Sequence, residues 1–242
     1  MSKFSLSSRI PSCHVTKDLV RGIEEYLISK IENQLKAHGD NPERDLPSEG
    51  LSVTVQDGLG IEVFKTISDH KLQKFSDDTN KIEIELSNSY DKNGPKFSFR
   101  IQFSTNKDLS RIQLRYEGND SREFMIGVLR GVHDRISTNK TLNWIYHPPA
   151  FIDGLLSLPM FFATVVLPFL LKDKPKEGIL LLLILLPCWG YAYLGRRMKP
   201  YVSFDTNLTD KYDAIWKWFI GGLFSFILFS YLFRNALEAV IR

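Results

Sequence analysis

Cys13 and His14 are the first residues along the chain whose types could do chemistry, as a nucleophile and a base. Adjacent residues seldom face each other usefully, because catalytic pairs are set by tertiary geometry. The other histidines are His38, His70, His133 and His147. None of these has ligand spacing with acids or cysteines. The sequence therefore predicts no catalytic residue, no metal ligand and no cofactor.

An acidic patch is formed by Asp77, Asp78, Glu83 and Glu85. The two glutamates share one face of a predicted strand, because side chains alternate along a strand. A cation site is one interpretation, but the calcium-loop pattern, with its glycine and closing glutamate, is absent. The second interpretation, which we favour, is a solvated face of a sheet.

Three arginines, Arg100, Arg111 and Arg115, project from the neighbouring predicted strands. Opposite charges that face each other across strands attract, so pairing with Glu83 and Glu85 is the default expectation. The alternative is a basic surface that faces anionic lipid headgroups. These five residues form the candidate binding surface.

An α+β domain over residues 1–140 is expected to position this surface. Alternating apolar and polar residues predict about five strands, at 51–56, 60–66, 82–86, 97–103 and 112–116. They would form an antiparallel sheet with one solvated face.

Two helices are expected to cover the apolar face of the sheet. Helical spacing predicts the N-terminal helix over 15–37, with Thr16 as its N-cap, and the second helix over 121–136. Asp120 and Glu123 have the spacing of a capping box for the second helix.

Residues 141–242 are predicted to form an all-α membrane domain. Apolar runs at about 151–171, 178–194 and 214–233 have charges only near their edges, which is typical of transmembrane helices. Buried core helices of a globular domain are the alternative. If the three runs cross a membrane, the loop that contains Tyr201, Val202 and Phe204 is expected to rest at the membrane surface.

Aromatic and basic residues flank these runs. The expected interface anchors are Trp144, Trp216, Lys217 and Trp218.

Small residues mark the third run. Gly221, Gly222 and Ser225 would let another helix approach closely, either the protein's own hairpin or a second copy.

The predicted location is a multi-pass integral membrane protein with three spans. The N-terminus lacks an apolar run for a signal peptide, and basic residues slightly favour the side of the α+β domain. We therefore expect a cytosolic N-terminus and a C-terminus on the opposite side. The net charge of +3 and the absence of basic runs with interleaved aromatics exclude nucleic acid as a partner.

Three functional hypotheses follow from this organisation. The first is a membrane-anchored recognition or signalling protein whose cytosolic domain binds a partner protein or a small ligand. The second is a self-assembling, pore-forming or membrane-disrupting effector, which would be a homo-oligomer. The third is an enzyme that acts at the membrane interface.

Overall fold

The computed structural model describes residues 2–37, 50–88, 96–118, 120–179, 195–219 and the single residues 181, 193, 221, 222, 225 and 229. In chain order its elements are β1 Ser2–Arg9, β2 Cys13–Val15, α1 Lys17–Ala37, β3 Leu51–Gln56, β4 Ile61–Phe64, η1 Ile67–Asp69, β5 Lys81–Asn88, β6 Lys96–Ser104, β7 Arg111–Gly118, α3 Ser121–Ser137, η2 Asn143–Tyr146, α4 Ala150–Asp173, α6 Arg196–Met198 and β8 Val202–Phe204. A further helix covers 207–219.

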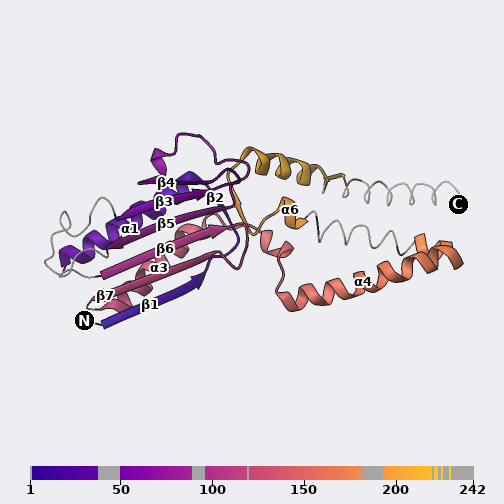
Figure 1. Ribbon diagram of the computed structural model, residues 1–242, viewed down its shortest axis with the longest axis horizontal. Helices are drawn as coiled ribbons and strands as arrows, with labels where there is room; N and C mark the ends of the chain where they lie inside the picture. The colour runs from indigo at the N-terminus through magenta and orange to yellow at the C-terminus, as the bar shows by residue number, and fades with distance from the viewer. Residues whose placement is uncertain are drawn as a thin grey trace.

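A six-stranded antiparallel sheet is the centre of the molecule, with the strand order β1-β7-β6-β5-β3-β4. Both α1 and α3 lie behind this sheet in the view of Figure 1, and the face toward the viewer carries no helix. The expected α+β fold, its five strands (β3 to β7) and its two helices are confirmed.

The core lies between the sheet and the two helices. One row of the sheet illustrates it: Val53, Ile84, Ile101 and Ile112 are register neighbours on successive strands, and all are fully buried. Ile23 of α1 closes the same core from the helical side. Each such buried side chain stabilises the fold by roughly 1.5–3 kcal/mol.

The helix starts differ from each other. The Thr16 hydroxyl accepts the Leu19 N–H at 3.2 Å, so the predicted N-cap of α1 is confirmed. The capping box expected at α3 is wrong. Asp120 has left-handed backbone angles (φ 53°), and its side chain makes no capping hydrogen bond.

Three strands of the fold were not expected. β1 pairs with β7 along one edge of the sheet, where Phe4 and Leu6 pack against the core. β2 pairs in parallel with β8, which comes from the loop predicted to rest at a membrane surface. Val202 is fully buried and Phe204 is 3% exposed, so this part of the loop belongs to the core instead.

The helical part of the chain requires a correction. The first expected span lies in α4, which projects away from the sheet (Figure 1). None of the helices in the described residues is both long and apolar enough to cross a bilayer. In α4, Asp153 pairs with Arg196, and Lys172 and Asp173 end the helix.

The prediction of a membrane domain with three transmembrane helices is therefore wrong for the described part of the chain. The predicted location, a three-pass membrane protein with its N-terminus in the cytosol, is wrong for the same reason. Almost all of the second expected span (178–194) and part of the third (214–233) lie outside the described residues. The boundary after residue 140 stays a prediction.

Candidate functional site

A ladder of ion pairs crosses the open face of the sheet. The Arg100 guanidinium contacts Glu83 and Glu85 of the neighbouring strand, each at 3.0 Å, and Lys81 contacts Glu83 at 2.6 Å. The pKa of Arg100 is raised, chiefly by its hydrogen bond to Glu85. The expected cross-strand pairing is thus confirmed for these three predicted site residues, and their charges largely compensate one another.

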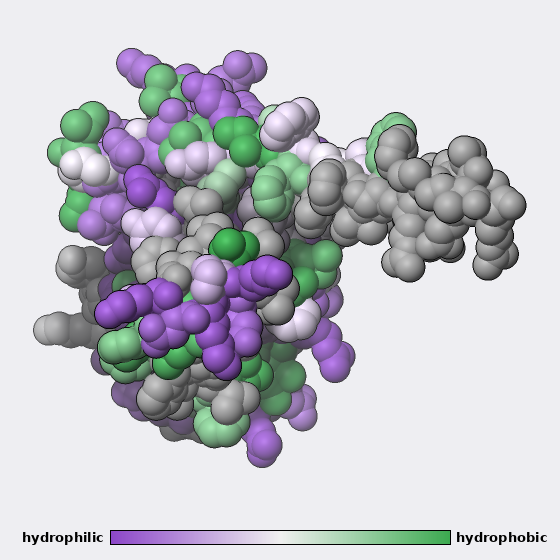
Figure 2. Space-filling view, turned by 90° about the vertical axis from the view of Figure 1, so that its right-hand side faces the viewer, coloured by the Kyte–Doolittle hydropathy of each residue, from purple (hydrophilic) through white to green (hydrophobic). Residues whose placement is uncertain are grey.

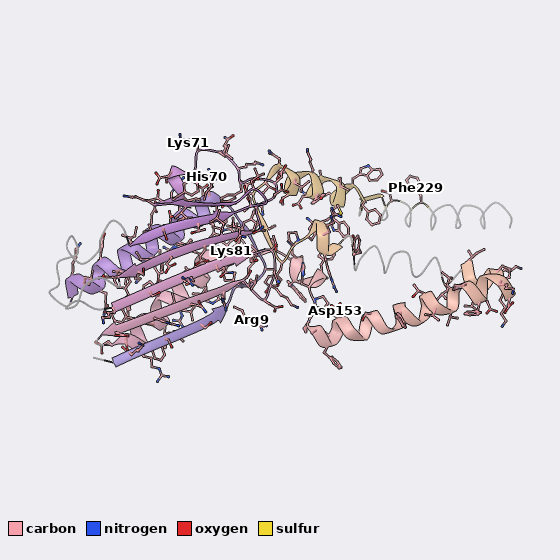
Figure 3. All side chains as sticks on the ribbon, viewed as in Figure 1. Arg9, His70, Lys71, Lys81, Asp153 and Phe229 are labelled. Atoms are coloured by element: carbon pink, nitrogen blue, oxygen red, sulfur yellow. The ribbon has the colours of Figure 1, made fainter. Side chains whose placement is uncertain are left out.

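Arg111 and Arg115 lie beside this ladder on β7, and no ion pair holds either of them within the described residues. Arg9, the last residue of β1, is the direct register partner of Arg111; it is also exposed and has no ion pair with any described residue. Figure 3 shows Arg9 at the end of β1 that is nearest to the start of α4. We call Arg9, Arg111 and Arg115 the basic strip.

Small polar residues surround the basic strip. Arg115 lies between Ser5 of β1 and Ser98 of β6 in the strand register, and Gln113 is the neighbour of Ser7. Because the neighbouring side chains are short, the arginine side chains project furthest from this part of the sheet. The strip therefore combines concentrated positive charge with hydroxyl and amide groups that can donate hydrogen bonds.

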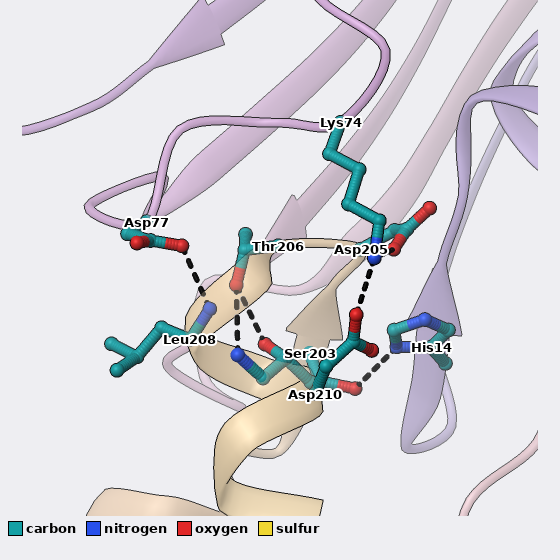
Figure 4. A network of polar contacts seen from close by, with 9 residues as sticks. His14, Lys74, Asp77, Ser203, Asp205, Thr206, Leu208 and Asp210 are labelled. Atoms are coloured by element: carbon teal, nitrogen blue, oxygen red, sulfur yellow. Dashed lines mark hydrogen bonds and ion pairs between the residues drawn. The ribbon is translucent and has the colours of Figure 1, made fainter.

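A second polar region joins the N-terminal and C-terminal parts of the described chain (Figure 4). Lys74 forms ion pairs with Asp205, at 3.4 Å, and with Asp210. The Asp77 carboxylate accepts the Leu208 N–H at 2.8 Å and so caps the helix over 207–219. We call this region the junction, since it holds that helix against the sheet domain.

The junction contains a pair with the residue types of a hydrolase, but its environment argues against catalysis. His14 Nδ1 lies 3.0 Å from the Ser203 hydroxyl across the β2–β8 pair. A nucleophile needs access to its substrate, and Ser203 is only 5% exposed. The adjacent Cys13 is fully buried, which raises the pKa of its thiol to about 12. A thiol that stays protonated is unreactive.

The remaining histidines have structural contacts. His70 packs between the rings of Phe64 and Phe75. His133 lies 3.0 Å from the Ser8 hydroxyl, and burial lowers its pKa. His38 lies outside the described residues, and no group of residues within the described ranges could hold a metal ion.

The predicted interface anchors have different surroundings. Trp216 packs against Phe219 and Tyr146, with ring centroids 5.8 and 5.6 Å apart, while Trp144 and Trp218 are exposed. Lys217 is exposed as well. Their role as anchors stays a prediction.

The predicted helix-packing residues are also exposed. They are Gly221, Gly222 and Ser225. A Cβ atom added at either glycine would meet no described atom within 4 Å. Their packing role stays a prediction.

The sequence reasoning missed two features of the site. Arg9 was not assigned to a strand, although Phe4 and Leu6 alternate with serines ahead of it. The junction could not be found from local patterns, because it joins His14 to a residue 189 positions away.

Comparisons with known proteins found no relationship for this chain. It matches no protein-family model, no curated protein and no solved structure.

Proposed function

We propose that this is a recognition protein that binds an acidic segment of a partner protein on the open face of its sheet. The observation that carries the proposal is the basic strip, three exposed arginines without carboxylate partners among the described residues. Arg9 and Arg111 are direct cross-strand neighbours, and like charges in that position destabilise a sheet. An anionic partner would remove this repulsion.

The chemistry of the strip favours carboxylates. Guanidinium groups bind carboxylates with two parallel hydrogen bonds. Ser5, Ser7 and Ser98 add hydroxyl donors between the arginines, and their small size would let an extended segment approach the sheet. The ion-pair ladder of Arg100, Glu83 and Glu85 borders the strip, and because its charges largely compensate one another, it does not oppose the approach of an acidic segment.

The helical face of the domain cannot offer the same surface. There α1 and α3 cover the sheet, and the inward side chains of the strands are buried. We therefore propose the opposite face for recognition; in Figure 1 no helix covers that face.

A fluorescence anisotropy titration tests the proposal. The full chain is titrated against a labelled peptide of alternating glutamate and serine, with a matched glutamine–serine peptide as the neutral probe. We expect the acidic peptide to bind and the neutral one not to bind. Exchanging Arg111 and Arg115 for glutamate should weaken binding at least about tenfold, since charge-assisted hydrogen bonds are lost and the charge is reversed.

The matched control exchanges Arg122 and Arg130 for glutamate, because this double variant makes the same charge change on α3, away from the open face. It should leave the affinity unchanged. Equal weakening by the control and by the variant of Arg111 and Arg115 would mean that the peptide responds to total charge only, and the proposal would fail. Binding that is insensitive to both changes would also refute it.

A further inference from the structure

A cavity of about 390 Å3 lies at the junction. It forms where the loop before β5, the loop after β6, the segment 196–200 and the helix over 207–219 meet. Figure 2 looks onto the end of the molecule from which the helices project and shows hydrophilic and hydrophobic residues side by side there. The lining residues used below are Asp77, Thr79, His147, Arg197, Phe204 and Tyr212. Cavities of this size bind small organic molecules.

The Thr79 hydroxyl is the first sign of a ligand. Thr79 is only 6% exposed, and its hydroxyl has no hydrogen-bond partner among the described residues. Buried polar groups are nearly always paired, and an unpaired one lowers stability. Because Thr79 lines the cavity, a molecule bound there could accept or donate a hydrogen bond at this hydroxyl.

The charges around the cavity are mostly positive. Arg197 is exposed, and no described carboxylate pairs with it, whereas Arg196 is held by Asp153 and by the Tyr146 carbonyl. The Asp77 carboxylate is already engaged, since it accepts the Leu208 N–H. Arg197 is therefore the cation that remains free to bind a ligand.

His147 adds an acceptor to the wall. Its Nε2 donates to the Lys199 carbonyl at 2.9 Å. Burial lowers its pKa, the hydrogen bond to the Lys199 carbonyl raises it, and the charges of Arg196 and Lys107 lower it, so the surroundings favour the neutral ring. Its Nδ1 then has a free lone pair, while Phe204 and Tyr212 contribute apolar ring surface.

We propose that this cavity binds a small organic anion, in which a carboxylate or phosphate group is attached to a compact apolar body. Arg197 binds the anionic group, Thr79 completes its hydrogen bonding with the ligand, and the apolar body lies against Phe204 and Tyr212. This site is independent of the basic strip. It lies at the junction, whereas the strip lies on the open face of the sheet.

Isothermal titration calorimetry of the full chain tests the site with four probes. Phenyl phosphate and benzoate carry the two anionic groups on the same ring, benzyl alcohol lacks the charge, and inorganic phosphate lacks the ring. We expect phenyl phosphate or benzoate, or both, to bind, and to bind at least about tenfold more tightly than either comparison probe. Which of the two binds better identifies the anionic group.

Three variants link binding to the cavity. Thr79→Val and Arg197→Gln should each weaken binding of the anionic probe about tenfold. Thr141→Val is the control, because the Thr141 hydroxyl is also buried with no hydrogen-bond partner in the described part of the chain, but Thr141 lines a different cavity. It should leave the affinity unchanged.

Thr79→Val should also keep or raise the melting temperature of the free protein, because it removes an unpaired hydroxyl at nearly constant shape. This readout separates loss of the site from loss of the fold. The proposal is overturned if neither anionic probe binds at millimolar concentration, or if binding persists unchanged in both Thr79→Val and Arg197→Gln.

Discussion

Glu24 is a carboxyl group inside the core, and its titration should control the stability of the fold. It lies on the inner side of α1, is 3% exposed, and accepts the Ile67 N–H at 3.0 Å. Burial is the largest influence and raises its pKa from 4.5 to about 7. The hydrogen bond from Ile67 and the charge of Arg21 lower the pKa but do not offset burial.

The direction of the pH effect follows from this shift. The folded protein holds the Glu24 proton more tightly than the unfolded chain does, so protonation stabilises the fold. The contribution is fully present below pH 4.5 and is lost as the pH rises to about 7. One pH unit corresponds to about 1.4 kcal/mol, so the total loss is about 3 kcal/mol.

Replacing Glu24 with glutamine isolates this contribution. The glutamine oxygen can still accept the Ile67 N–H, but the side chain cannot ionise. We expect Glu24→Gln and the natural chain to differ by less than about 1 kcal/mol at pH 5. At pH 8 the variant should be more stable by about 3 kcal/mol.

Urea unfolding of both proteins at pH 5, 6, 7 and 8, followed by circular dichroism, measures the difference. Other titrating groups cancel in this comparison because they are shared. Glu25→Gln is the control, since Glu25 is the exposed neighbour on the same helix and its replacement removes the same charge at the surface instead of in the core. A constant offset between Glu24→Gln and the natural chain, or a variant that is less stable at pH 8, would refute the reasoning.

Three further predictions concern packing and reactivity. Gly131→Ala should destabilise the fold by about 1–3 kcal/mol, because the added Cβ would collide with the Tyr26 ring of α1. At Gly127 the added Cβ has open space, so Gly127→Ala should stabilise α3 by about 0.5–1 kcal/mol. Thermal unfolding of the two variants compares them, and equal effects would contradict the packing described. In a variant whose other cysteine is replaced by serine, Cys13 should resist iodoacetamide at pH 8 in the folded chain and react after guanidinium unfolding. Stoichiometric labelling of the folded chain would contradict the buried, protonated state of this thiol. A fragment of residues 1–140 lacks β8, so its free energy of unfolding should be about 3–6 kcal/mol lower than that of the full chain. Urea unfolding of the two proteins measures the difference, and an unchanged midpoint would show that β8 contributes little to stability.

Local patterns predicted much of the sheet and its two covering helices. The alternation in Ile82, Ile84 and Leu86 identified β5, and it placed Glu83 and Glu85 on the solvated face with Arg100. Such residues are predictable because strand alternation is a property of consecutive residues.

The features that depend on distant segments were not predictable in this way. β8 has three residues, all buried, so it shows no alternation, and only its pairing with β2 makes it a strand. The cavity beside Thr79 and Arg197 likewise depends on how segments far apart in the sequence meet. The expected membrane spans were inferred from apolar runs alone, without the ion pair that ties Asp153 at the start of α4 to Arg196.

The parallel pairing of β2 with β8 has a consequence for synthesis on the ribosome. His14 and its partner Ser203 are 189 positions apart, so at a synthesis rate of about 5–20 residues per second β2 waits roughly 10–40 s for β8 to be made. During that interval the apolar side chains of Cys13 and Val15, both fully buried in the finished protein, lack their covering strand. The nascent chain should therefore present a site for chaperones at its N-terminal end, and the emergence of β8 from the ribosome should remove that site.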